Sequence, residues 1–225
     1  LSVASFQKAI TVQEASRATL THTTADEPIT LILSKKGWIR SRIGHGLDLS
    51  QTAFKEGDGL KQVLEGRSVW PVVVLDSLGR TYTLDAAEIP GGRGDGVPVG
   101  SLVELQNGAE VAAMISGLPE QHYLLSNSGG YGFIAKLADM VGRVKAGKVM
   151  ISLEAGEKVL PPQAVFTVSL INPDCKVVLA SSANRLLAFA LGELKVMAKG
   201  RGLQLMNLGE DEKLAHIAVV STPEF

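Results

Sequence analysis

The chain has 225 residues, of which 45% are hydrophobic and 20% charged, so it can bury a core in one large or two small domains. It contains no run of 18 or more apolar residues, which excludes a membrane-spanning helix of ordinary length. Cys175, the one cysteine, excludes an internal disulfide framework and fits a reducing compartment. The four histidines lack the spacing of metal ligands, so we expect no metal site; they are His22, His45, His122 and His216.

Residues 1–27 contain few large apolar side chains. We expect them to form a helical or extended connector from a missing N-terminal part of a longer protein, with one domain over residues 28–225. The opening Leu-Ser-Val-Ala has no Lys/Arg-led signal peptide and suggests a fragment.

Four segments of the chain can be aligned with one another, at residues 29–40, 72–83, 123–133 and 177–187. Each contains an apolar strand, a short polar turn and a second strand of alternating character. The turns end in residues that accept positive φ, namely Gly37, Gly79, Gly130 and Asn184. Three positions earlier lie short polar side chains that can bind turn amides, namely Ser34, Asp76, Asn127 and Ser181. These residues predict four structural hairpins.

A glycine-rich element follows each turn, at 56–59, 93–96, 146–148 and 199–202. In the last three repeats we expect strands after it, at 102–105, 149–153 and 203–206, then a turn and another strand, at 111–115, 164–168 and 215–220. Short helical turns are expected at 134–140 and 189–194. Four-stranded units whose turns are 42, 51 and 54 residues apart predict an all-β, propeller-like ring of at least four blades, open or completed by terminal segments.

Gly-x-Gly sequences also occur in phosphate-binding loops. A dinucleotide loop needs a helix after the glycines, however, and strands or loops are expected here. We therefore expect no nucleotide cofactor in this chain.

The net charge of −1 hides an uneven distribution. Basic residues are concentrated in residues 29–45, 136–148 and 195–201, which carry +4, +3 and +3, so the remainder carries −11. Residues 68–96 carry −2. Solvated strand faces would give such a pattern, but local fields decide where a polyanion binds, so a nucleic-acid partner is compatible with the acidic total.

Four motifs carry a family resemblance: Leu-Ser-x-x-Gly-Trp-Ile-Arg-Ser at 33–41, Pro-Val-Val-Val-Leu-Asp-Ser-x-Gly-Arg at 71–80, Gly-Tyr-Gly-Phe at 130–133, and Arg-x-Lys-Ala-Gly-Lys at 143–148. From Pro28 onward the chain resembles the C-terminal β-pinwheel of type IIA topoisomerase A subunits, found in gyrase A and topoisomerase IV A. Gyrase carries a basic Gln-Arg-Arg-Gly-Gly-Arg/Lys-Gly box in its first blade, for wrapping DNA and negative supercoiling. The corresponding residues 44–59 lack it, so the resemblance points to topoisomerase IV.

The resemblance implies a non-catalytic domain of an ATP-dependent type II topoisomerase that decatenates and relaxes DNA in chromosome segregation. DNA cleavage would use a tyrosine beside an arginine on a separate N-terminal domain. None of Tyr82, Tyr123 and Tyr131 follows an arginine, and we expect them to fill blade cores or edges. ATP and Mg²⁺ would be used by other domains and by the B subunit of an A2B2 holoenzyme. The fragment itself is expected to be monomeric, and the full protein to be cytoplasmic and nucleoid-associated, with a peripheral place at the inner membrane as an option.

Lysines and arginines spaced along a curved rim would neutralise phosphates and favour bending or presentation of duplex DNA without reading its sequence. The candidate DNA-binding residues are Lys35, Lys36, Arg40, Arg42, Lys136, Arg143, Lys145, Lys148, Arg185, Lys195, Lys199 and Arg201. We expect blade 1 to dominate and blade 2 to contribute little, because acids accompany Arg80 and Arg93.

Three other functions stay open at this point. They are a gyrase A C-terminal domain, a propeller-type protein-interaction module, which the near-neutral charge permits, and a catalytic propeller such as a glycosidase. The last needs two carboxylates across a pocket, whereas the acids here lie mostly in turns.

Overall fold

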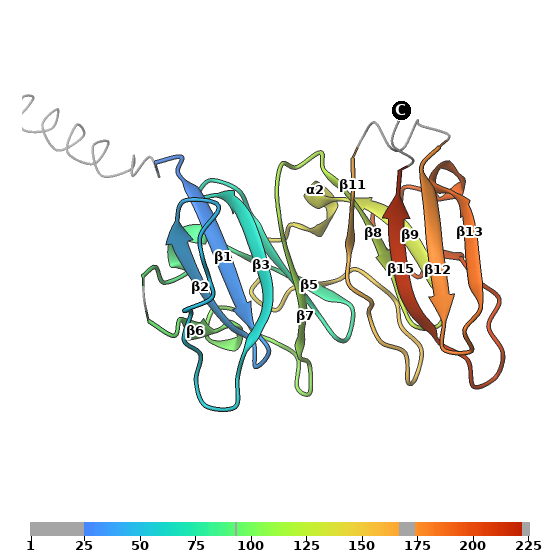
Figure 1. The fold of residues 1–225 in the computed structure, drawn as a ribbon, viewed down its shortest axis with the longest axis horizontal. Helices are drawn as coiled ribbons and strands as arrows, with labels where there is room; N and C mark the ends of the chain where they lie inside the picture. The colour runs from blue at the N-terminus through green and yellow to red at the C-terminus, as the bar shows by residue number, and fades with distance from the viewer. Residues whose placement is uncertain (1–24, 93, 167–173, 222–225) are drawn as a thin grey trace, which may run out of the picture.

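A computed structural model describes residues 25–92, 94–166 and 174–221. Within these residues, four antiparallel sheets lie side by side in chain order as blades 1 to 4 (Figure 1). Blade 1 contains β1 (Pro28–Ser34), β2 (Trp38–Ile43), β3 (Leu60–Arg67) and β6 (Val97–Pro98). Blade 2 contains β4 (Val72–Asp76), β5 (Arg80–Leu84), β7 (Val111–Ser116) and β10 (Lys148–Val149). Blade 3 contains β8 (His122–Ser126), β9 (Tyr131–Lys136), β11 (Gln163–Val165) and β14 (Leu203–Gln204). Blade 4 contains β12 (Lys176–Ser181), β13 (Leu186–Ala190) and β15 (Leu214–Val220).

The fourth strand of each complete blade comes from the next repeat. After the hairpin of blade 2, the chain returns to pair β6 with β2 of blade 1, and β10 and β14 return in the same way to β5 and β9. The expectation that each repeat builds its own four strands was therefore wrong. We call β6, β10 and β14 the donated strands. The segments that lead into them are called crossovers: residues 89–96, 141–147 and 195–202.

The hairpin turns have the expected construction. Gly37, Gly79, Gly130 and Asn184 all have positive φ, between 59° and 83°. The polar side chain three positions earlier accepts a hydrogen bond from the amide that follows the turn, as from Arg80 N to Asp76 Oδ1 (2.8 Å) and from Trp38 N to Ser34 Oγ (3.0 Å). The turns lie along the lower edge of Figure 1.

The crossover glycines serve strand insertion. Gly96, Gly147 and Gly202 have φ of 85°, 63° and 85°, and each lies against the backbone of the strand that receives the donated strand. A Cβ atom on Gly202 would lie 2.2 Å from the carbonyl oxygen of Gly132. A side chain there would block the insertion, which gives these glycines a structural reason unrelated to phosphate binding.

Two of the strands expected after the glycine motifs are short, and one is missing. β10 and β14 each end after two residues because the next amides, of Met150 and Leu205, donate to the turn carbonyls of Gly79 and Gly130. Residues 102–105 form no strand, since the 3-10 helix η2 (Val99–Ser101) and its C-terminal turn precede them. The expected strands at 111–115 and 215–220 are confirmed as β7 and β15. The strand at 164–168 is described through β11, and its last two residues lie outside the described part.

Short helical turns follow the hairpins, as expected for two of the repeats. α2 (Leu137–Met140) and the 3-10 helices η1 (Ala86–Glu88) and η3 (Leu191–Glu193) lead into the crossovers. No helix in the described part of the chain is long and apolar enough to cross a membrane.

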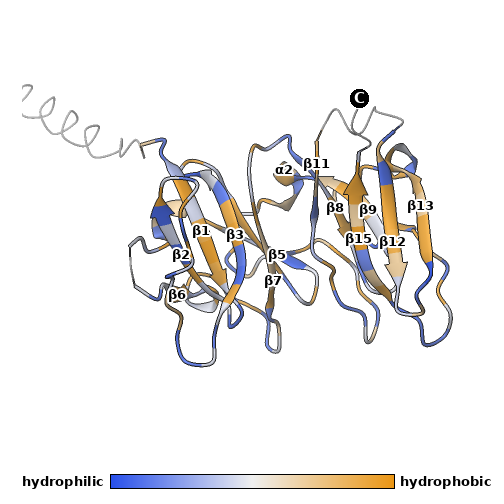
Figure 2. Ribbon diagram, in the orientation of Figure 1, coloured by the Kyte–Doolittle hydropathy of each residue, from blue (hydrophilic) through white to orange (hydrophobic). Residues whose placement is uncertain are grey.

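The core lies between successive blades. One apolar cluster joins blades 1 and 2, a second joins blades 2 and 3, and a third joins blades 3 and 4. Figure 2 shows the strands mostly orange and the connecting loops mostly blue. Tyr82 and Tyr123 are 1% and 7% exposed, which confirms that they fill blade cores. Burial raises the pKa of Tyr123 to about 12.

Blades 1 and 4 lie at opposite ends of the molecule, so the described residues form an open arc rather than a closed ring (Figure 1). Each sheet has two edges. β3, β7, β11 and β15 form what we call the inner edge, where β3 contacts β7 and β11 contacts β15. The donated strands and β13 form the outer edge.

Candidate nucleic-acid interface

The predicted DNA-binding residues divide into two groups in the structure. Some are held by carbonyl or carboxylate groups of the protein, and others are exposed with no such partner in the described part. The difference follows local position in the blade rather than the charge of the surrounding sequence.

Arg40 belongs to the held group. It is 3% exposed, and its guanidinium donates to the carbonyls of Gly94 (2.5 Å) and Ala53 (2.7 Å) while lying over the Phe54 ring (5.0 Å). Burial lowers the pKa of Arg40 below its ordinary value, and the charge of Arg42 lowers this pKa further. Arg40 therefore joins the loop 44–59 to the first crossover, and its donors are not available to a phosphate.

Arg80 and Lys148 grip a crossover in a similar way. Arg80 donates to the carbonyls of Ala146 and Gly147, at 2.9 Å and 3.0 Å, and Lys148 Nζ donates to the carbonyl of Val141 (2.7 Å). Burial lowers the pKa of Lys148, and the charge of nearby Lys199 lowers it further against the opposite effect of Asp139. Arg93 lies outside the described residues.

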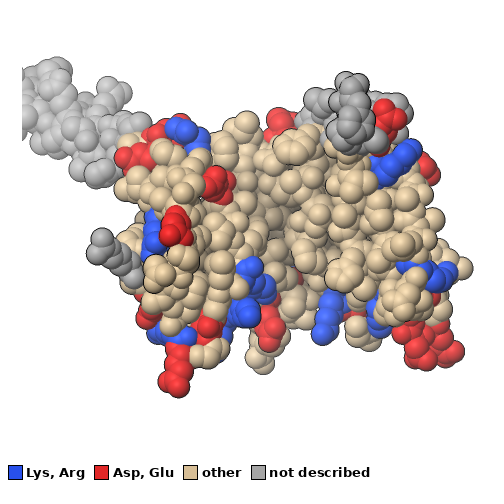
Figure 3. Space-filling model, viewed as in Figure 1, with Lys and Arg blue, Asp and Glu red and all other residues tan. Residues whose placement is uncertain are grey.

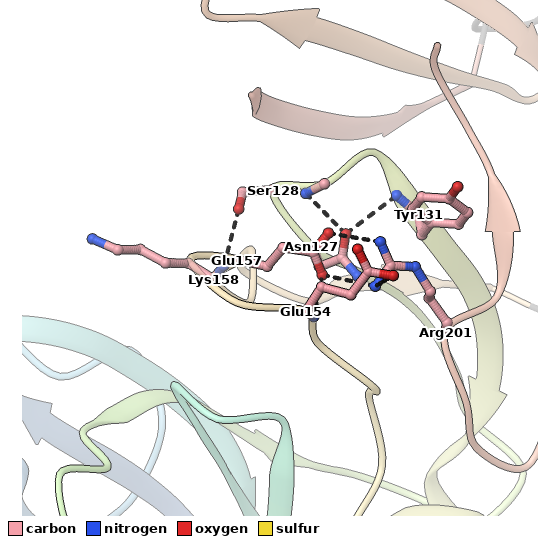
Figure 4. Close-up of polar contacts among 8 residues, drawn as sticks. Asn127, Ser128, Tyr131, Glu154, Glu157, Lys158 and Arg201 are labelled. Carbon is pink, nitrogen blue, oxygen red and sulfur yellow. Dashed lines mark hydrogen bonds and ion pairs between the residues drawn. The ribbon is translucent and has the colours of Figure 1, made fainter. Parts of the chain in front are cut away.

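Arg201 is held by two carboxylates and a ring (Figure 4). Its guanidinium makes two bonds to Glu157, of 2.8 Å and 3.0 Å, approaches Glu154 at 3.3 Å, and lies 4.2 Å from the centroid of Tyr131. Arg185 is paired with a carboxylate in blade 4: it makes two bonds to Glu212, of 2.5 Å and 2.8 Å, and a third to the carbonyl of Asn207. Both arginines join loops of the fold.

The remaining candidates near the hairpins are only partly free. Lys36 Nζ donates to the carbonyl of Glu56 (3.1 Å), and Arg42 is half-buried. Lys136 pairs with Glu120 at 3.0 Å, but both side chains are exposed, so this pair is weak and exchangeable. Lys35 is exposed at the first turn, with no polar partner for its ammonium group among the described residues. Blade 1 thus presents fewer free charges than its sequence charge of +4 indicates.

The exposed cations gather on two neighbouring crossovers at the outer edge. Arg143 and Lys145 lie on the crossover to β10, and Lys195 and Lys199 on the crossover to β14. Within the described ranges, none of these four side chains has a hydrogen bond or ion pair. The two crossovers are joined by the amide of Ser152 donating to the carbonyl of Gly200 (3.0 Å). We call these residues, together with Lys148 between them, the outer basic patch.

The face of the molecule seen in Figure 3 has a different character. Lys, Arg, Asp and Glu lie mainly along its upper and lower margins, whereas the middle, over β7 and β11, is uncharged. A groove of about 600 Å³ lies there, and its lining includes Trp70, Met114, Tyr123 and Pro161. This surface offers nothing that would attract a phosphate backbone. The cations of the outer basic patch lie on the opposite edge of the sheets.

The sequence did contain a signal that distinguishes Arg40. When the four hairpins are aligned on their turn residues, Arg40 occupies the position of Tyr82 and Phe133, which are 1% and 0% exposed. An arginine at a buried position of a repeat is expected to be a structural group with protein acceptors. The partners of Arg201 carry no such signal, because Glu157 is 44 residues away.

The described residues contain no group of three or more His, Cys, Asp or Glu side chains arranged to hold a metal ion. Cys175 is a buried free thiol, and His45 contacts the carbonyl of Gly66 through Nε2 (2.8 Å), as expected for a histidine in a turn. Neither residue lies in the outer basic patch.

Comparisons with known proteins agree with the fold. Residues 176–221 match the family model described as the DNA gyrase C-terminal domain, a beta-propeller. The chain is 68% identical to the DNA topoisomerase 4 A subunit of Neisseria gonorrhoeae over 95% of its own length and 28% of that relative. It is 35% identical to the corresponding protein of Escherichia coli K12 over 83% of its length and 24% of that relative. The chain therefore spans about a quarter of the length of these curated relatives.

A solved structure covers almost the same region. The C-terminal domain of E. coli ParC superimposes with a TM-score of 0.79 at 33% identity, and the match covers 87% of this chain and 80% of that one.

Proposed function

Because the chain belongs to the family of C-terminal domains of topoisomerase IV A subunits, we propose that it binds duplex DNA along the outer edge of blades 2 to 4 without reading its sequence. The observation that carries this proposal is the outer basic patch, whose Arg143, Lys145, Lys195 and Lys199 are exposed and unpaired among the described residues. The patch replaces blade 1 as the main contact, since Arg40 is consumed by carbonyl groups.

The physical basis is electrostatic. Each lysine or arginine that neutralises a phosphate releases condensed counterions, which favours binding without base contacts. Two adjacent crossovers that carry such residues present successive charges to a phosphate backbone, so a duplex following the arc would be bent or held for presentation. We propose a role in decatenation and relaxation for the enzyme that contains this domain.

The proposed enzyme needs parts that this chain does not contain. DNA cleavage would belong to an N-terminal region of the A subunit, and ATP and Mg²⁺ would be used there and by a B subunit in an A2B2 holoenzyme. A cytoplasmic, nucleoid-associated location follows from this proposal. Residues 44–59 lack the basic box of gyrase, and their Lys55 stacks on Trp38 (3.5 Å) instead of pointing away from the blade. We therefore propose that the enzyme does not introduce negative supercoils.

The test compares two charge-removal variants. Changing Arg143, Lys145, Lys195 and Lys199 to Ala should weaken binding to a random duplex and lower the slope of log affinity against log salt by about 0.9 for each phosphate no longer neutralised. Changing Lys35 and Lys36 to Ala should lower the slope less. Fluorescence anisotropy over a salt series measures both, and circular dichroism confirms folding.

A larger loss in the blade 1 variant would show that another edge faces the DNA. No measurable DNA binding by the unmodified chain, together with capture of a protein partner, would favour the protein-interaction module instead. Negative supercoiling of relaxed plasmid by the reconstituted enzyme with ATP would contradict the assignment away from gyrase.

A further inference from the structure

Blade 4 lacks the strand that completes the other three blades. In blades 1 to 3, the second residue after the turn residue pairs with a donated strand: Ile39 with Val97, Thr81 with Lys148, and Gly132 with Leu203. These three acceptor residues are all buried. The corresponding residue of blade 4 is Leu186, which is 75% exposed and pairs with no residue on that side within the described part.

The exposure of Leu186 extends over one face of the sheet. Val178, Ala180 and Ala188 lie on the same face as Leu186, and each is half-buried or exposed. The positions that match Val178 and Ala180 in blade 1 are Leu31 and Leu33, at 0% exposure. In blades 2 and 3 they are also at most 1% exposed: Val73, Leu75, Leu124 and Ser126. We call Val178, Ala180, Leu186 and Ala188 the open face of blade 4; Figure 2 shows β13 in orange.

The backbone of blade 4 repeats this difference. In the complete blades, the carbonyl of the turn residue accepts a hydrogen bond from the donated segment: Val99 N to Gly37 O (2.9 Å), Met150 N to Gly79 O (2.9 Å) and Leu205 N to Gly130 O (2.7 Å). No amide of the described residues donates to the carbonyl of Asn184, which occupies this position in blade 4. Side chains and backbone therefore leave the same place for a strand.

The three donated segments define what fits this place. Each reads glycine, two strand residues, then a buried apolar residue, as in Gly-Val-Pro-Val at 96–99, Gly-Lys-Val-Met at 147–150 and Gly-Leu-Gln-Leu at 202–205. The glycine has positive φ, and a Cβ there would lie 2.2–2.5 Å from the carbonyl oxygen of the second residue after the turn. A segment with this pattern can pass over the backbone of Leu186, and one with a side chain in place of the glycine cannot.

The spacing of the donors indicates where the missing one lies. Gly96, Gly147 and Gly202 follow their acceptor turns by 59, 68 and 72 residues. The same interval counted from Asn184 passes Phe225. We propose that the open face of blade 4 is covered by a later segment of the same A subunit, which contributes a glycine-led strand to β13 and packs a further apolar unit on Leu186. An exposed apolar edge strand is otherwise a site for pairing with other chains.

Amide exchange tests the proposal. The amides of Leu186 and Ala188 point away from β12, because the neighbouring residues make the hairpin bonds. Hydrogen–deuterium exchange should be fast at both amides in the 225-residue chain and at least tenfold slower in the full-length protein. Equal exchange in the two proteins would overturn the proposal, and so would protection that falls on dilution, because a second copy would then be the occupant.

A substitution provides an independent measurement. Leu186→Asp should lower the melting temperature of the domain by several degrees in the full-length protein and leave the 225-residue chain unchanged, since its side chain is exposed there. Ile43→Asp is the matched control, because Ile43 is also an apolar strand residue and is 73% exposed. It should be neutral in both proteins. A neutral Leu186→Asp in the full-length protein would show that nothing covers this face.

Discussion

Arg201 and Glu157 form a two-bond ion pair that joins the crossover to β14 to a loop of blade 3, with distances of 2.8 Å and 3.0 Å. Glu157 is 7% exposed and Arg201 24%, so neither charge is freely solvated. A DNA phosphate could reach this arginine only by competing with a positioned carboxylate. The pair is therefore part of the fold, although its sequence segment has the composition of a DNA-binding element.

Arg201→Ala should destabilise the domain and leave DNA binding nearly unchanged. Removing the guanidinium leaves the Glu157 carboxylate unpaired and largely buried, which costs about 2 kcal/mol. Lys199→Ala, two residues away on the same crossover, is the matched control. It should change the free energy of unfolding by less than about 0.5 kcal/mol, as for an ordinary surface residue, and should weaken DNA binding. Urea unfolding and anisotropy measure the two effects, and the reverse result would exchange the roles of these residues.

Arg40→Ala should have a larger effect on stability. It removes two hydrogen bonds to carbonyls and the contact with Phe54, and we expect a loss of about 3 kcal/mol. Arg40→Lys should recover little, because an ammonium group cannot reproduce the planar fork that reaches both Gly94 and Ala53. Lys35→Ala, in the exposed turn of the same hairpin, should unfold at the same urea concentration as the unmodified chain. Full stability of Arg40→Lys would show that the fork geometry is unimportant.

These arginines show where sequence analysis succeeds and fails. The turn residues and the long strands were predictable because glycine, asparagine and alternating apolar residues act locally. The donated strands were not, since two residues have no period, and their partner in the preceding blade is chosen by the path of the crossover. Summing charge over 29–45 overestimated blade 1 because the sum cannot register the carbonyls that surround Arg40. The four free cations of the outer basic patch were predicted individually, but their gathering on adjacent crossovers depends on the insertion of β10 and β14.

Acid should weaken the domain through the pair of Arg185 and Glu212. The bonds from Arg185, together with the amide of Gly209, lower the pKa of Glu212 from 4.5 to about 2. A carboxyl whose folded pKa is depressed adds stability that is fully present above about pH 4.5 and is lost as the pH falls towards 2. Urea midpoints of the unmodified chain and of Glu212→Gln should therefore differ most near neutral pH and converge between pH 4.5 and 2. A constant difference over this range would contradict the assignment.

Gly202→Ala should prevent correct insertion of β14. The new methyl group would meet the carbonyl oxygen of Gly132 at 2.2 Å and its carbonyl carbon at 2.4 Å, and neither backbone atom can move without breaking the pairing with Leu203. We expect a loss of more than about 3 kcal/mol, since backbone strain adds to a steric clash.

Gly108→Ala separates the two causes of this loss. Gly108 has φ of 78°, close to the 85° of Gly202, but no atom lies within 4 Å of the position of its Cβ. It should therefore lose only the cost of an alanine with positive φ, about 1–2 kcal/mol. Thermal unfolding of the two variants measures the difference, and hydrogen exchange at Gly132 and Tyr131 should rise in Gly202→Ala alone. Equal destabilisation would mean that the close approach of the crossover does not limit insertion, and that the glycine is needed for its backbone angle alone.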